Sequence, residues 1–170
     1  MNNKANDKET VRVATPQILI GVILLAFGAM SPIGVTRAQT LAPLKAVPAQ
    51  YANKQMPKGW WTDPKIIKEG EEIYTGRKYG NNVPENKRVF CAVCHGADGK
   101  PAVQGVPDQS RADRMNRLSD SYWFWRVAEG VPDTLMLAWK GRLDEKEIWK
   151  VIAFQHQFSH GGKAQEHKHP

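Results

Sequence analysis

The sequence has little cysteine. Its 170 residues include only Cys91 and Cys94, which are separated by two residues. A bridge across so short a loop adds little stability, which excludes a disulfide-stapled scaffold. No segment alternates apolar and polar residues as a half-buried strand does, and no internal repeat is present, so an all-α fold is predicted.

The charge excess is small as well. The chain carries 24 Lys and Arg against 17 Asp and Glu, and the basic residues are scattered along it. With no nucleic-acid-binding motif beside them, this distribution argues against a nucleic-acid partner. A modest positive charge suits an acidic protein partner or an anionic membrane surface.

One long uncharged stretch is present, over residues 13–36, and basic residues precede it. A basic flank followed by an apolar core is typical of an export signal. We therefore expect residues 1–38 to be a signal peptide, cut after Ala38, or an N-terminal membrane anchor, since about 20 apolar residues span a bilayer. Either alternative makes the rest of the chain periplasmic or otherwise extracytoplasmic, soluble or anchored by residues 13–36.

The composition divides the chain after residue 38 into three segments. Residues 39–62 contain three prolines and no sustained period, which predicts a Pro/Ala-rich linker or arm. Residues 63–160 are expected to form one compact domain. The polar segment 161–170 is expected to be a disordered tail.

Three helices are predicted inside this domain. The first begins at Asp63, which can cap it, and places apolar residues and Gly70 on one face. The second covers residues 119–129 and ends before a glycine. The third begins at Asp144, which has the spacing of a capping box with Glu147, and ends near Ser159 or His160.

The chemistry-bearing motif is CAVCH, residues 91–95. Two thiols at this spacing can add to the two vinyl groups of one haem, and the adjacent His95 can reach the iron from the same face, so Cys91, Cys94 and His95 predict a c-type haem. A zinc site needs four ligands, and no second CxxC or CxxH is present. A thioredoxin-like dithiol needs a βαβ setting, which this chain lacks.

The sixth iron ligand has several candidates. Met136 is favoured because it lies in a loop between two predicted helices, 41 residues after His95, and such a loop can fold over the open haem face. The alternatives are Met115, His156 or His160, and an open position, which would suit gas binding or catalysis.

The motif and its surroundings resemble class I (mitochondrial-type) monohaem cytochromes c over residues 63–160. The resemblance rests on Gly70 and Tyr74 before CAVCH, Leu118-Ser-Asp, Glu129-Gly130, the Met136 loop, and an aromatic at Phe154. It implies a small all-α fold, three to five helices around one covalently attached haem, with His95 and Met136 as axial ligands.

The expected function is therefore that of an exported electron carrier, not an enzyme, with a redox protein donor and acceptor as partners. One alternative is a haem c subunit of a membrane oxidoreductase complex, held there by the N-terminal segment. A second is an open-site haem sensor or enzyme. A third is metal binding by the histidines at the C-terminal end, where His156 and His160 are one helical turn apart and His167 and His169 follow in the tail.

Overall fold

The computed structural model describes residues 41–79, 84 and 88–168. Every regular element in these residues is a helix, which confirms the all-α class. The α-helices are α1 (Pro64–Tyr74), α2 (Cys91–His95), α3 (Ala112–Met115), α4 (Asp120–Glu129) and α5 (Glu145–His156). Short 3-10 helices are η1 (Ala49–Tyr51), η2 (Arg77–Tyr79) and η4 (Gln157–His160). The expected export segment, 1–38, lies outside the described residues.

The three predicted helices are present, and their caps explain where they begin. The side chain of Asp63 accepts hydrogen bonds from the backbone N–H groups of Lys65 (2.8 Å) and Ile66 (3.2 Å) at the start of α1. Ser119 accepts from Tyr122 at the start of α4, and Asp144 forms a complete capping box with Glu147 at the start of α5. Each cap satisfies backbone donors that would otherwise have no partner in the helix.

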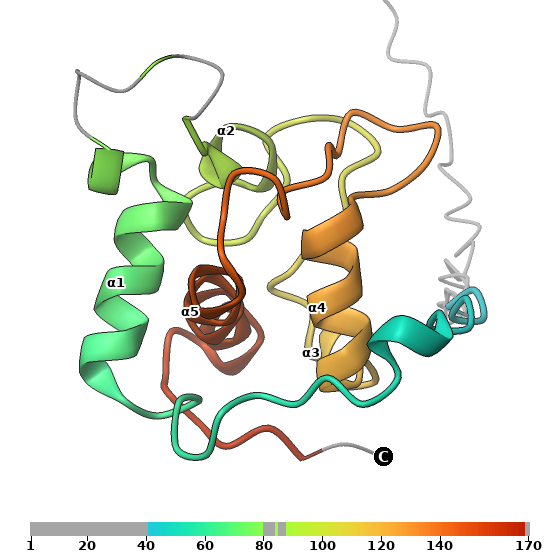
Figure 1. The fold of residues 1–170 in the computed structure, drawn as a ribbon, viewed down its shortest axis with the longest axis horizontal. Coiled ribbons are helices and arrows are strands. Elements are labelled where there is room, and N and C mark those ends of the chain that lie inside the picture. Colours follow the sequence, from blue (N-terminus) through green and yellow to red (C-terminus); the bar gives the residue numbers. More distant parts are fainter. Residues whose placement is uncertain (1–40, 80–83, 85–87, 169–170) are drawn as a thin grey trace, which may run out of the picture. The chain divides into compact units, whose positions relative to one another are not determined.

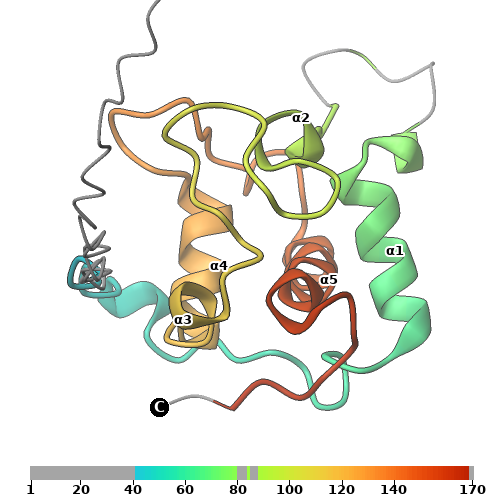
Figure 2. The ribbon, with the colours of Figure 1, turned by 180° about the vertical axis from the view of Figure 1, so that it is seen from behind.

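Helix α5 is the centre of the domain. In Figures 1 and 2, α1 and α4 lie on opposite sides of it. Its helical conformation ends at His156 and continues as η4 to His160, so the predicted end near Ser159 or His160 coincides with the end of this 3-10 turn. Gly161 follows in the left-handed conformation that commonly stops a helix.

The contact between α1 and α5 is very close. A Cβ on Gly70 would lie 2.0 Å from the carbonyl oxygen of Lys150 and 3.1 Å from Cβ of Phe154. Only glycine permits two helix backbones to approach so closely. The aromatic ring of Phe154 packs beside this contact, 5.2 Å from the ring of Tyr74, as the resemblance implies.

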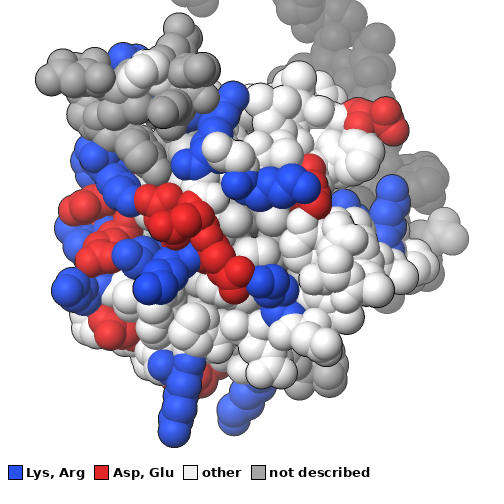
Figure 3. Space-filling model, in the orientation of Figure 1, with Lys and Arg blue, Asp and Glu red and all other residues white. Residues whose placement is uncertain are grey.

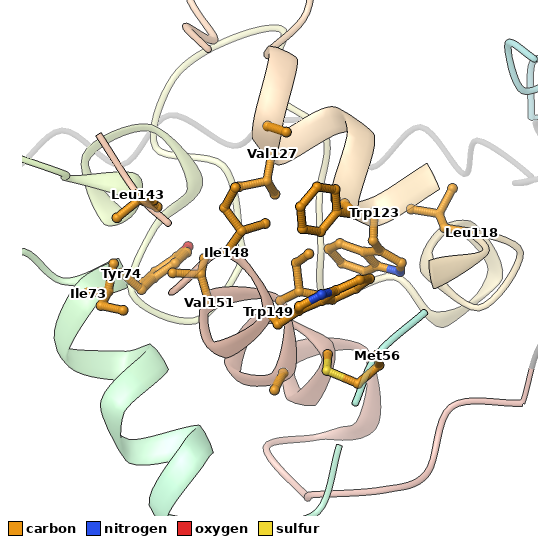
Figure 4. Packing of buried hydrophobic residues seen from close by; sticks show 14 of the residues in the cluster. Met56, Ile73, Tyr74, Leu118, Trp123, Val127, Leu143, Ile148, Trp149 and Val151 are labelled. Carbon is orange, nitrogen blue, oxygen red and sulfur yellow. The ribbon is translucent and has the colours of Figure 1, made fainter. Parts of the chain in front are cut away.

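The apolar core extends from this contact towards α4 (Figure 4). Trp149 on α5 lies 4.7 Å from the ring of Phe124 on α4 and is 2% exposed. Further buried members come from α1, the segment before α2, α3, α4 and the arm; they include Ile73, Tyr74, Val89, Met115, Trp123 and Met56.

Segment 41–62, the described part of the predicted arm, lies along α4 rather than away from it. The hydroxyl of Ser121 donates to the carbonyl oxygens of Ala52 and Lys54, both at 2.9 Å. The backbone N–H of Met56 donates to Asp120 at 2.8 Å. Trp61 is buried at the end of the arm. The arm therefore belongs to the packed domain.

Two helices lie in segments for which the sequence predicts none. Helix α3 lies between the first and the second predicted helices, and α2 consists of the CAVCH motif itself. Both have five residues or fewer, and so short a helix carries no detectable apolar period.

Candidate functional site

The CAVCH residues form one short helix, α2. Cys91 and Cys94 are both free thiols and both partly buried, while Val93 between them is 65% exposed. Residues three apart in a helix share a face, so the two thiols are neighbours. Val89, which is fully buried just before α2, anchors the helix to the core.

The surroundings of Cys91 are unfavourable for a thiolate. Burial raises the pKa of its thiol to about 12. Thiol–disulfide exchange needs a thiolate, and reactive CxxC pairs have a lowered pKa. The burial of Cys91 therefore disfavours dithiol redox chemistry that needs its thiolate.

His95 closes the helix in a largely apolar environment. Burial lowers the pKa of its imidazole, which favours the neutral ring. Its Nδ1 atom is buried and has no hydrogen-bond partner among the described residues. A neutral imidazole whose buried Nδ1 atom has no hydrogen-bond partner among the described residues fits the role of an iron ligand. Cys91, Cys94 and His95 belong to the same short helix. The residues present therefore suit a covalently attached haem.

The chain after His95 turns sharply and is held by α1. The hydroxyl of Tyr74 donates to the carbonyl oxygen of Gly96 at 2.7 Å. Gly96 has φ +73°, and a Cβ there would lie 2.0 Å from the carbonyl oxygen of Lys100. The backbone N–H of Ala102 then donates to the carbonyl of Cys94 at 3.0 Å. These contacts set the position of α2 against α1.

Met136 lies in the loop between α4 and α5. Its backbone N–H donates to the hydroxyl of Thr134 at 3.1 Å, and its carbonyl accepts from the N–H of Val131 at 3.0 Å. Gly130, with φ +68°, lets this backbone pass directly over the end of α4, since a Cβ there would lie 2.3 Å from the Met136 carbonyl. These contacts therefore fix the position of the Met136 backbone relative to the end of α4.

Two exposed leucines flank this methionine. Leu135 is 80% exposed and Leu137 is 55% exposed, whereas Met136 is partly buried. In both ribbon views, the segment between α4 and α5 and helix α2 lie at the same end of the domain (Figures 1 and 2). The structure thus brings the Met136 loop to the end that holds Cys91, Cys94 and His95.

The other candidate ligands are engaged in different contacts. Met115 is 5% exposed and belongs to the core cluster, on α3 towards the opposite end of the domain from α2 (Figures 1 and 2). The Nε2 atom of His156 lies 2.9 Å from Nδ1 of His167, and Nδ1 of His160 is 2.9 Å from the carbonyl oxygen of His156.

The tail makes contacts that the sequence did not signal. Nε2 of His167 lies 2.7 Å from the carbonyl oxygen of Leu118, and its ring is 5.1 Å from that of Trp61. Within the part of the chain that the structure describes, no three His, Cys, Asp or Glu side chains are arranged to hold a metal ion.

Comparison with known proteins agrees with this geometry. Residues 84–154 match the family model of cytochrome c oxidase, cbb3-type, subunit III. No solved structure matches the chain significantly. Among the described helices, none has the length and apolarity to cross a membrane. The matched region contains the CAVCH helix, the Met136 loop and most of α5, and it identifies residues 84–154 as a cytochrome c domain, a member of a monohaem c-type cytochrome family.

Proposed function

We propose that the chain carries single electrons outside the cytoplasmic membrane through one haem c, attached by thioether bonds to Cys91 and Cys94 and ligated by His95 and Met136. The observation that supports this most directly is the position of the Met136 loop at the α2 end of a domain matched to cytochromes c. When bound, the haem supplies an iron that gains and loses one electron at a time.

The residues of the chain have distinct parts in this proposal. The two thiols on α2 hold the group, and the neutral imidazole of His95 offers a nitrogen to the iron. The hydrogen bonds at Thr134 and Val131 hold the backbone of Met136, so its thioether can stay bound in both oxidation states. An unchanged ligand set needs little reorganisation when an electron moves. We propose that the chain acts as an electron carrier rather than as an enzyme in its own right, which the match to a cytochrome c family supports.

We propose the domain organisation that the composition predicts, amended by the contacts of the arm and by those of His167 in the tail. Residues 1–38 are a signal peptide or a membrane anchor, and 63–160 hold the haem. Segment 39–62 is an arm that packs on α4 through the bonds of Ser121.

A subunit of a membrane oxidoreductase complex is the second candidate function. It is favoured by the description of the matched family, a subunit of the cbb3-type oxidase. In that case the uncharged stretch 13–36 is retained as an anchor, and the electron acceptor is another subunit of the complex.

The charges near the proposed haem edge do not form a patch of one sign. Lys140 pairs with Glu129 at 2.8 Å and Lys100 with Asp98 at 3.5 Å. Figure 3 shows acidic and basic side chains interspersed on the α1 side, beside a largely uncharged surface over α4. Exposed Val93, Leu135 and Leu137 offer apolar area at the same end. We therefore expect partner binding that depends only weakly on ionic strength.

The deciding experiment is the optical spectrum of the exported protein, reduced, with and without carbon monoxide. A covalent haem whose spectrum ignores carbon monoxide supports the closed, six-coordinate carrier. The Met136→Ala variant should then bind carbon monoxide, whereas Met115→Ala should leave the spectrum unchanged. Binding of carbon monoxide to the unaltered protein would instead favour the open-site sensor or enzyme.

The mass of the mature protein distinguishes the two forms of the carrier. A chain that begins at Gln39 means a cleaved signal peptide and a free periplasmic protein. Retention of residues 13–36 in the membrane fraction favours the oxidoreductase subunit.

A further inference from the structure

The loop that carries Met136 has a polar clamp at its base. The loop leaves α4 after Glu129 and returns at Lys140, and the Nζ atom of Lys140 lies 2.8 Å from Oε1 of Glu129. At the same place, the N–H groups of Trp139 and Lys140 donate to the carbonyl of Ala128 at 3.0 and 3.1 Å. The carboxylate of Glu129 therefore joins the two ends of the loop.

A third segment reaches this carboxylate from far away in the sequence. The hydroxyl of Tyr51, in the arm, donates to Oε1 of Glu129. Tyr51 is 9% exposed, and its ring packs 6.0 Å from that of Phe124 on α4. Burial raises the pKa of Tyr51, and its bond to Glu129 adds to the shift, so the hydroxyl keeps its proton and remains a donor.

Glu129, the centre of this clamp, is the residue before Gly130, whose backbone contacts that of Met136. Gly130 follows Glu129, and the carbonyl of Met136 passes so close to it that a Cβ would not fit. The next N–H, of Val131, donates to that same carbonyl. A shift of Glu129 would therefore be passed to the Met136 backbone through packed atoms.

We propose that Tyr51 is a positioning residue for the sixth iron ligand: through Glu129 and Lys140, the arm holds the Met136 loop closed. This inference rests on the proposed function, because it assumes that Met136 ligates the iron. It assigns the arm a part in controlling access to the iron, beyond linking the domain to the N-terminal segment.

The test compares two variants that each weaken the contact between the arm and α4. Tyr51→Phe removes only the hydroxyl that bonds to Glu129. Ser121→Ala removes the hydroxyl that bonds to Ala52 and Lys54, and so loosens the arm without touching the clamp. Both are made in the full-length holoprotein.

The main readout is the rate at which cyanide binds the ferric iron, because cyanide can enter only when Met136 leaves. We expect Tyr51→Phe to raise this rate about tenfold, the effect of losing one hydrogen bond to a charged group. We also expect a weaker absorption band from methionine sulfur on ferric iron, and faster amide hydrogen exchange at Trp139 and Lys140. Ser121→Ala should stay within about twofold of the unaltered protein.

A double-mutant cycle adds a specific check. Glu129→Gln alone should speed cyanide binding, and the double variant with Tyr51→Phe should be faster by much less than the product of the two single effects. Equal acceleration by Tyr51→Phe and Ser121→Ala would overturn the inference, because the arm would then act only through general stability.

A parallel Met136→Ala sample separates the possible failures. If its spectrum and cyanide rate equal those of the unaltered protein, Met136 is not the ligand, and both the proposed ligation and this inference fall. If Met136→Ala opens the iron while Tyr51→Phe changes nothing, the carrier function stands and only the role of Tyr51 is refuted.

Discussion

The α-carbon of Gly70 lies against the backbone of Lys150, so that a Cβ at Gly70 would be 2.0 Å from the Lys150 carbonyl oxygen. Neither the Gly70 backbone nor the Lys150 carbonyl can move aside at low energetic cost, since both belong to the backbones of packed helices. The crossing of α1 over α5 thus depends on the absence of a single methyl group.

Gly70→Ala should destabilise the holoprotein by about 2 kcal/mol. Overpacking in a core costs about 1–3 kcal/mol, and a Cβ 2.0 Å from a backbone oxygen places Gly70→Ala near the upper end of that range. The cost therefore exceeds the gain of about 1 kcal/mol that alanine brings inside a helix. The measurement is the free energy of unfolding in denaturant. Gly141→Ala is the matched control, because nothing lies within 4 Å of a Cβ there, and it should change stability by less than about 0.5 kcal/mol. Equal stability of the two variants would contradict the packing at Gly70.

Tyr74→Phe should cost about 1–2 kcal/mol, because it leaves the carbonyl of Gly96 without its 2.7 Å donor. Burial raises the pKa of Tyr74, so the hydroxyl is a donor throughout the working pH range. Thermal unfolding of the ferrous protein measures the loss. Tyr122→Phe should have a much smaller effect, since that hydroxyl only accepts a 3.3 Å bond from Arg126. If Tyr122→Phe lost more stability than Tyr74→Phe, Tyr74 would not hold the end of α2.

The stabilising effect of Glu129 should depend on pH. The hydrogen bond from Lys140, and then that from Tyr51, lowers the pKa of this carboxyl below its usual 4.5. A lowered pKa in the folded state means stabilisation that is complete above the unfolded pKa and is lost as the pH falls through the folded value. The difference in unfolding free energy between the unaltered protein and Glu129→Gln should thus be largest near neutral pH and shrink below about pH 4.5. A difference that grows in acid would refute the clamp.

His167→Ala should release the tail. The variant loses both the contact with Nε2 of His156 and that with the Leu118 carbonyl. Proteases cut segments that open locally, so trypsin should cleave after Lys163 several-fold faster than in the unaltered protein. Gln165→Ala, at an exposed position of the same segment, is the control and should be cleaved at the original rate. Unchanged cleavage of His167→Ala would mean that this histidine does not hold the tail.

Local rules predicted the helices and their caps. Asp63 and Pro64 begin α1, and Asp144 with Glu147 begins α5, because caps depend on residues within one turn of each other. The close approach at Gly70 also follows from a glycine on an apolar face beside large residues. The roles of Cys91, Cys94, His95 and Met136 remain predictions, and the chemistry of the CAVCH motif supports them.

The contacts that join distant segments had no signal in the sequence. Tyr51 and Glu129 are 78 residues apart, and His167 and Leu118 are 49 apart. A tyrosine in a proline-containing arm and a histidine in a polar tail show no period, so composition alone suggested a linker and a disordered end.

By itself, the sequence determined the class of the domain and the boundaries of its main helices, and it predicted the chemistry of its motif, because each depends on residues that are neighbours along the chain. Only the tertiary structure decided that the arm packs on α4, that Glu129 clamps the Met136 loop, and that the tail returns to Trp61. Those contacts join segments that the packing of α1, α4 and α5 brings together, and the side chains that make them carry no pattern along the chain.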